Sequence, residues 1–137
     1  MTSLDEFRDR YHRALAAFIR GDATPVMDLW SSGDDTTLAN PFGPPVRGLA
    51  AVREAGERAA SQVTDGEAFA VENISTHSSS DLAYDVDIHR FTAKMPGADE
   101  PAPVSLRVTT VYRREGDGWR VAHRHADPLP LQEPTAP

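Results

Sequence analysis

The sequence contains no cysteine among its 137 residues. Disulfides and thiolate metal sites are therefore excluded, and because a reducing compartment suits such a chain, we expect a cytoplasmic location. No stretch approaches the roughly 20 consecutive apolar residues of a membrane-spanning helix. The first ten residues are charged and lack the apolar run of a signal peptide. We therefore expect no membrane partner.

Basic residues are also scarce. Lys and Arg number 14 against 21 Asp and Glu, which gives a formal net charge of −7. Because nucleic-acid binding needs a basic face, we expect no nucleic-acid partner. The chain has neither a phosphate-cradling glycine loop nor a dinucleotide-binding fingerprint, so the sequence predicts no nucleotide cofactor.

Helical signals fill the first half of the chain. Ser3 and Glu6 form a capping box, and apolar residues then recur at helical spacing until Gly21. Thr24 with Pro25 is typical of a helix start, and this short second helix is expected to run through Trp30. A third, alanine-rich helix is expected over residues 49–63.

From residue 67 the hydrophobic period changes to alternation, with a bulge expected near Glu72 and Asn73. Further alternating segments lie at 82–92, 104–113 and 119–127, and their short links predict an antiparallel meander. Helices followed by strands are the α+β pattern.

We therefore predict an α+β fold in which three N-terminal helices pack on a curved antiparallel sheet that closes over one pocket. A chain of this length suits a single domain, which we place at residues 1–127. The proline-rich segment 128–137 is expected to be a disordered tail.

Polar residues gather at the end of the last predicted strand. Strict alternation places Trp119, Val121, His123, His125 and Asp127 on one side of it. This set begins apolar and ends polar, so we expect its polar end to line the mouth of a cavity. The alternative is an exposed or interfacial sheet face.

The two middle strands are ambiguous. In segment 82–92 the more hydrophobic face is expected to be buried, which would leave Asp87 and His89 in solvent. Those polar residues would equally suit a cavity. Segment 104–113 carries the same ambiguity, because either face could point inward.

Two segments resemble a known family. The run GDATPVMDLWSSGDDTTLANPFGPPVRG and the ending GWRVAHRHADP are similar to ketosteroid isomerase-like and SnoaL-like members of the nuclear transport factor 2-like superfamily. The resemblance covers roughly residues 4 to 128 and implies a cystatin-like cone with one pocket. The same fold hosts isomerases, cyclases, dehydratases, hydrolases and non-catalytic binding domains.

The resemblance does not extend to the isomerase mechanism. In those isomerases the general base is an aspartate directly before a proline, and Asn40 takes that place here. The oxyanion tyrosine of the isomerases corresponds to Ala14, and their neutral acid falls near Thr109 or Thr110. The cyclase and hydrolase branches place an acid/base aspartate on the last strand, where this chain has His125.

We therefore expect a domain that binds a small hydrophobic organic ligand. The alternative is an acid/base enzyme with His125 as general base, because an imidazole titrates near neutrality. The catalytic candidates are His125, Asp127, His123 and Asp87. The candidates for ligand contact are Trp30, Asn40, Phe42, Tyr84, His89, Arg107 and Thr109.

Two further expectations concern assembly and metals. Sheets of this kind leave one face uncovered, which predicts a homodimer through the outer sheet face. His123, His125 and Asp127 form a possible metal set, but same-face neighbours on a flat strand are about 7 Å apart at the backbone. Three such side chains converge poorly on one ion, and the sequence predicts no metal site.

Overall fold

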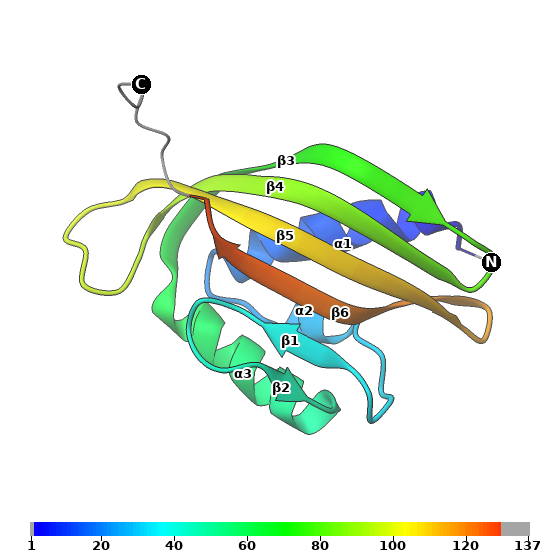
Figure 1. The fold of residues 1–137 in the computed structure, drawn as a ribbon. Helices are drawn as coiled ribbons and strands as arrows, with labels where there is room; N and C mark the ends of the chain where they lie inside the picture. The colour runs from blue at the N-terminus through cyan, green and yellow to red at the C-terminus, as the bar shows by residue number, and fades with distance from the viewer. Residues whose placement is uncertain (1, 130–137) are drawn as a thin grey trace, which may run out of the picture.

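The computed structural model describes residues 2–129 of the chain. Its elements are α1 (Leu4–Phe18), α2 (Thr24–Met27), β1 (Thr37–Ala39), β2 (Val46–Arg47), α3 (Leu49–Gln62), β3 (Thr64–Ser78), β4 (Leu82–Lys94), β5 (Ala102–Glu115) and β6 (Gly118–Pro128). Figure 1 shows the strands as one curved sheet with the helices behind it. The predicted α+β fold with three helices before the main strands is confirmed.

The first helix begins where the capping box predicts. The Ser3 hydroxyl accepts a hydrogen bond from the Glu6 amide at 3.1 Å. The second helix is shorter than predicted, because it ends at Met27 and Trp30 instead forms a parallel bridge with Val121 of β6. Trp30, which was expected to end this helix, thus pairs with the sheet instead.

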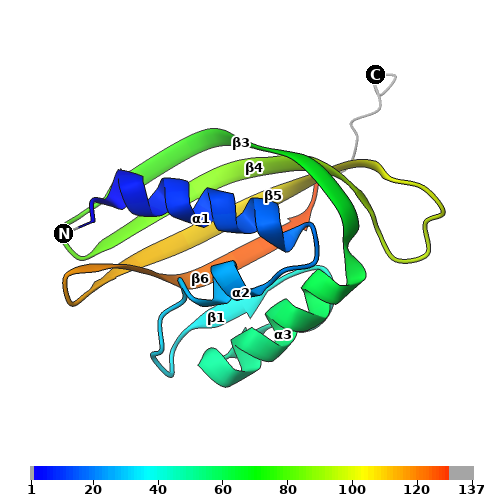
Figure 2. The same cartoon turned by 180° about the vertical axis from the view of Figure 1, so that it is seen from behind.

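The six strands lie in the order β2-β1-β6-β5-β4-β3. Strands β3 to β6 form the predicted antiparallel meander, whereas β1 pairs with β6 in parallel. Figure 2 shows that α1 crosses the β3–β5 part of the sheet and α3 lies beside β1, so all helices cover the same face. We call this covered face the inner face and the opposite one the outer face.

Two irregularities decide which side chains point inward. Strand β3 shifts register between Asn73 and Ser75, next to the predicted bulge. In β6, Val111 pairs with His123 and Tyr112 pairs with Val121, so Ala122 is an extra residue on the bulged strand. A bulge of this kind reverses the alternation of side chains for the rest of the strand.

The core fills the space between the helices and the inner face. It includes Phe7 and Tyr11 of α1, whose rings both meet the buried Tyr112 ring edge-on at 6.0 Å. In the described residues, no helix has the length and apolar character needed to cross a bilayer. Strand β6 continues through Pro128, and the Leu129 amide donates to the Ser105 carbonyl. Most of the predicted tail lies outside the described residues.

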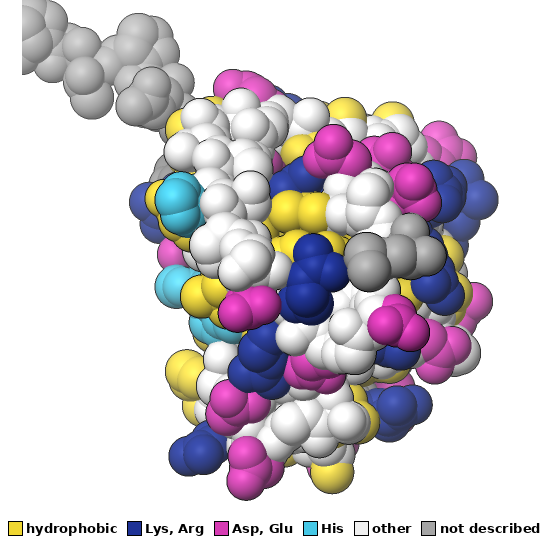
Figure 3. All heavy atoms as spheres, turned by 90° about the vertical axis from the view of Figure 1, so that its right-hand side faces the viewer, with side chains coloured by type: hydrophobic (Ala, Val, Ile, Leu, Met, Phe, Trp, Pro, Cys, Tyr) yellow, Lys and Arg dark blue, Asp and Glu magenta, His cyan; other side chains and the backbone are white. Residues whose placement is uncertain are grey.

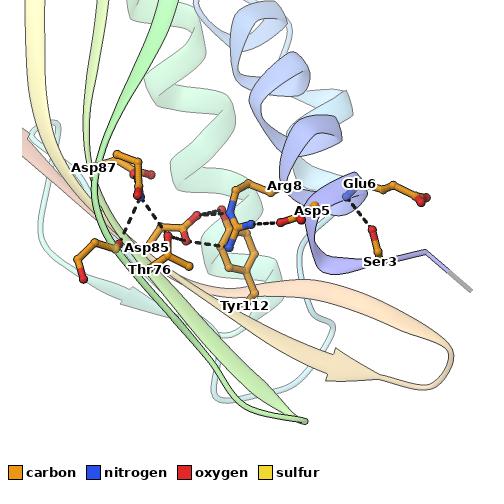
Figure 4. A network of polar contacts seen from close by, with 10 residues as sticks. Ser3, Asp5, Glu6, Arg8, Thr76, Asp85, Asp87 and Tyr112 are labelled. Atoms are coloured by element: carbon orange, nitrogen blue, oxygen red, sulfur yellow. Dashed lines mark hydrogen bonds and ion pairs between the residues drawn. The ribbon is translucent and has the colours of Figure 1, made fainter.

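One ion pair fixes α1 to the sheet. The Arg8 guanidinium donates from Nε and Nη2 to the two carboxylate oxygens of Asp85, at 2.7 and 2.9 Å. Asp85 is fully buried and also accepts hydrogen bonds from Thr76 at 2.9 Å and Tyr112 at 3.0 Å. Figure 4 shows Arg8 reaching from the helix to this carboxylate. Burial alone would lower the Arg8 pKa, but the hydrogen bonds to Asp85 and the negative charges nearby, that of Asp85 first, together outweigh it and raise that pKa.

Replacing Arg8 should therefore destabilise the fold strongly. The Arg8→Met variant leaves the Asp85 carboxylate buried without its counter-charge, and we expect the free energy of unfolding to fall by about 3–5 kcal/mol. Urea denaturation followed by circular dichroism measures this change. Arg10→Met, on the exposed side of α1, is the control and should change stability by less than about 0.5 kcal/mol.

A double variant separates the lost charge from lost packing. Arg8→Met combined with Asp85→Leu removes both charges, so it should recover much of the stability lost in Arg8→Met alone. If the double variant is less stable than the single one, the contribution of this ion pair is not electrostatic.

Gly66 marks the closest approach of β3 to the end of α1. A Cβ placed on Gly66 would lie 2.1 Å from the Ile19 carbonyl oxygen, whereas one on Gly43 would meet nothing within 4 Å. Since a backbone atom cannot move aside as a side chain can, Gly66→Ala should destabilise the protein by roughly 1–3 kcal/mol. Gly43→Ala is the matched control, and equal unfolding midpoints for the two variants would contradict this interpretation.

Candidate functional site

A buried polar group lies on the inner face, between α1 and the sheet. It consists of His12 on α1 and Asp87 and His89 on β4, and each can offer an atom within 4.8 Å of the other two. His89 Nε2 is 3.6 Å from the Asp87 carboxylate, and the His12 and His89 rings meet edge-on with centroids 5.9 Å apart. We call these three residues the inner triad.

Burial sets the charge state of this triad. It lowers the pKa of His89 to about 4, although the Asp87 carboxylate acts in the opposite direction. It also lowers the pKa of His12. Burial by itself would raise the pKa of Asp87, but the nearby His89 ring and a 2.7 Å hydrogen bond from Asn73 outweigh it and lower that pKa. At neutral pH the triad therefore holds two neutral imidazoles and one carboxylate.

The ring nitrogens of the triad are poorly satisfied. Within residues 2–129, neither His89 nitrogen has a hydrogen-bond partner, and the buried His12 Nε2 has none. An unpaired buried polar group costs about 1–3 kcal/mol. Such groups are rare in native proteins, and each calls for an explanation.

A hollow lies beside the triad, between α1, α3 and the end of the sheet. Its volume is about 80 Å³, several times the ~10–15 Å³ that a single water needs. Phe69 forms part of its wall and also packs edge-on against His89, with ring centroids 5.2 Å apart. The apolar residues that line it include Leu15, Phe18, Ile19, Val26, Met27, Leu38, Val63, Phe69, Phe91, Met95 and Leu106.

Three polar side chains interrupt this apolar lining. Arg124 lies on β6, and its Nη1 donates to the Tyr11 hydroxyl at 3.3 Å. Among the residues that the structure describes, no carboxylate pairs with Arg124. The buried Trp30 Nε1 also lacks a partner there. Asn40 uses its side-chain oxygen to accept from the Phe42 amide at 2.9 Å.

Four of the predicted ligand contacts lie in the interior. Trp30, Asn40 and Phe42 line the hollow, and His89 is buried on the inner face, behind Phe69. Asp87, a predicted catalytic residue, lies beside His89. A ligand-binding or catalytic role for these residues stays a prediction.

The expected placement of the last-strand residues is wrong. His123, His125 and Asp127 lie on the outer face, because the bulge at Ala122 reverses the alternation and turns Arg124 and Ala126 inward instead. The His125 side chain is 56% exposed. His123 Nδ1 is 2.7 Å from the Thr37 hydroxyl, and Asp127 is paired with Arg107 at 2.8 Å.

The preference for burying the more hydrophobic face of β4 is also wrong. Ala83, Asp85, Asp87, His89 and Phe91 are all buried, whereas Tyr84 is 40% exposed on the outer face. In β5, Val108, Thr110 and Tyr112 are buried, so Arg107 and Thr109 point outward. Tyr84, Arg107 and Thr109 are therefore outside the hollow. The buried hydrogen bonds of Asp85 and Asp87 explain why polar residues can occupy the inner face of β4.

Sequence reasoning missed two residues of the site. His12 lies one helical turn after Arg8, on the face of α1 that meets the sheet, and helical spacing could have placed it there. Arg124 could not be placed inward without knowledge of the bulge, because strict alternation puts it on the opposite face from Trp119.

The outer face carries a shallow groove of mixed character. Its lining includes Ile74, Val86, Ile88, Thr109 and His125. Figure 3 views the molecule from one end of the sheet, and there positive and negative side chains are interspersed while histidines gather along one edge.

Solved structures share this fold. A protein from Thiobacillus denitrificans, provisionally named a calcium/calmodulin-dependent protein kinase type II association domain, is 25% identical, with a TM-score of 0.75, covering 95% of this chain and 98% of its own. A ketosteroid isomerase-like protein from Erwinia carotovora atroseptica is 20% identical, with a TM-score of 0.75 and coverage of 93% and 94%.

A third structure, from Streptomyces avermitilis, is provisionally named a dehydratase of the NTF2-like family. It is 17% identical, with a TM-score of 0.75 and coverage of 93% and 95%. No curated protein matches the chain. The SnoaL-like domain family matches residues 7–130, which is nearly the whole chain. This chain belongs to the SnoaL-like domain family.

Proposed function

We propose that the protein binds a small, mostly apolar organic molecule that carries an anionic oxygen group, in the hollow beside the inner triad. The observation that carries this proposal is Arg124, a cation in a mostly apolar lining that no carboxylate pairs with in residues 2–129. A charge in such surroundings is costly unless it is paired, so a ligand carboxylate would supply the missing counter-charge.

The other polar groups of the lining support the same ligand class. The Trp30 indole can only donate a hydrogen bond, and its buried Nε1 has no partner within the described chain. Two donors in an apolar wall fit a ligand with acceptor oxygens at one end and a hydrocarbon body. The small volume of the hollow favours a single ring or a short chain.

An acid/base enzyme is the second candidate. Its support is no longer His125, which is exposed on the outer face, but the two neutral imidazoles of the inner triad directly behind the Phe69 wall. Turnover of a bound molecule, lost in His89→Phe, would favour this candidate over simple binding.

The proposal extends to the oligomeric state and the cellular location of the protein. We propose a homodimer through the outer face, because its large apolar side chains Ile74, Leu82 and Tyr84 are 56%, 50% and 40% exposed. Large apolar side chains exposed on one face favour association. We also propose a cytoplasmic location, since the chain has no cysteine.

Arg124→Met should weaken binding of anionic ligands selectively. Benzoate and benzamide are matched probes, since they share a ring and differ in charge. Losing a charge-assisted hydrogen bond typically costs about 1.5–3 kcal/mol, so the benzoate Kd should rise by about 10- to 100-fold while benzamide binding changes little. Calorimetric or NMR titration measures both constants.

Two controls accompany this titration. Arg120→Met changes an exposed arginine of the same strand and should leave both constants unchanged. Ala126→Phe fills the hollow from β6 and should abolish binding of both probes. Benzoate binding that is indifferent to Arg124→Met and Ala126→Phe would refute the proposed site.

A charge on the outer face should dissociate the dimer. Ile88 lies in the groove of that face, and Ile88→Arg would bury an unpaired guanidinium in the proposed interface. Sedimentation equilibrium at micromolar concentration should give twice the chain mass for the parent and the single chain mass for the variant. Ala50→Arg, on the exposed side of α3, is the control, and a monomeric parent would contradict the dimer.

A further inference from the structure

We propose that the inner triad of His12, Asp87 and His89 binds one divalent first-row transition metal ion, with Zn²⁺ as the natural candidate. Two imidazoles and a carboxylate form a donor set that such ions accept, and three protein ligands leave a coordination position open. The set lies inside the cone and is distinct from the residues that line the apolar hollow.

The distances are close to those that a metal needs. His89 Nε2 and the Asp87 oxygen are 3.6 Å apart, and adjacent ligands of a tetrahedral zinc ion lie about 3.3 Å apart when its bonds are ~2.0 Å. Three atoms at most 4.8 Å apart leave a point within about 2.8 Å of each. Closing on an ion therefore requires each donor to move by less than ~1 Å.

The chemical state of the triad suits a metal as well. Metal ligation needs neutral imidazoles and an ionised carboxylate, and burial keeps both rings neutral at pH 7 while Asp87 stays charged. The buried His12 Nε2 and both nitrogens of the fully buried His89 lack hydrogen-bond partners in the described chain. A bound ion would take one nitrogen of each ring and so supply a partner to one unpaired nitrogen of each histidine in the described chain.

The surroundings position the ligands. Asn73 donates a 2.7 Å hydrogen bond to Asp87 and holds the carboxylate in place, as second-layer partners of metal ligands do. His12 is only partly buried and is the most exposed member of the triad.

Two cations influence the triad. Arg8 lowers the His12 pKa and Arg124 lowers that of His89 through their charges. Arg8 is neutralised by Asp85. Among the described residues Arg124 has no such partner. It opposes the ion, so an anion at the open position would offset both positive charges.

Metal titration of untagged protein tests the proposal independently of the ligand site. Chelation and dialysis first remove any metal. When Zn²⁺ is then added, we expect elemental analysis to find one Zn²⁺ per chain, and we expect the unfolding temperature to rise. Co²⁺ in the same site should give the visible absorption of a low-coordinate complex. His89→Phe and His12→Phe should each weaken Zn²⁺ binding by more than about 100-fold, and Asn73→Ala by about 10- to 100-fold.

The outer-face histidines provide the matched control. The double variant His123→Ala and His125→Ala removes two imidazoles that lie on the other side of the sheet, and it should bind Zn²⁺ like the parent. Zn²⁺ uptake that disappears in this variant, or survives in His89→Phe, would overturn the proposal. So would a folded parent that takes up no metal, and that result would leave the benzoate titration unaffected.

Discussion

The ion pair between Arg8 and Asp85 is the constraint on which the interior depends. Asp85 is fully buried and accepts from three side chains on α1, β3 and β5, so it ties the helix to three neighbouring strands at once. Residues one and two turns further along the same helix face then have fixed positions. His12 joins Asp87 and His89 in the triad, and Leu15 forms part of the wall of the hollow. The helix therefore connects the polar and apolar parts of the interior, and any change in its docking acts on both.

The interior is divided into two chemically different compartments. Near Arg8 the inner face carries carboxylates and imidazoles, whereas near α3 it carries mostly hydrocarbon. Phe69 is the boundary, since it faces the hollow and packs against His89. A polar group in a low-dielectric region interacts strongly with whatever it contacts. The Phe69 ring is the contact through which the triad and the hollow adjoin.

The sequence predicts the fold well because its signals there are local. The Ser3 cap, the Thr24-Pro25 start and the alternating strands each follow from a few neighbouring residues, and the structure contains all of them. Which face of each strand points inward depends on partners far away in the chain. Asp85 and Asp87 are tolerated inside only because Arg8, Thr76 and Asn73 lie opposite them, and no rule of local hydrophobicity contains that information. The end of helix α2 has the same origin, since Trp30 bridges to a strand 91 positions later.

A single extra residue in β6 is the reason why the sequence mispredicted the site. Up to Val121 the predicted phase of β6 is right, and Trp119 and Val121 are buried. Ala122 then inserts into the strand, so everything beyond it changes sides: Arg124 enters the hollow and His125 leaves it. A bulge costs little when the inserted side chain is small, and alanine can be buried on either face without an unpaired polar group. The consequence for chemistry is large, because the strand places a guanidinium in the wall of the hollow instead of the predicted imidazole. The family resemblance assigned the acid/base position by counting along this strand, and counting fails wherever a bulge intervenes.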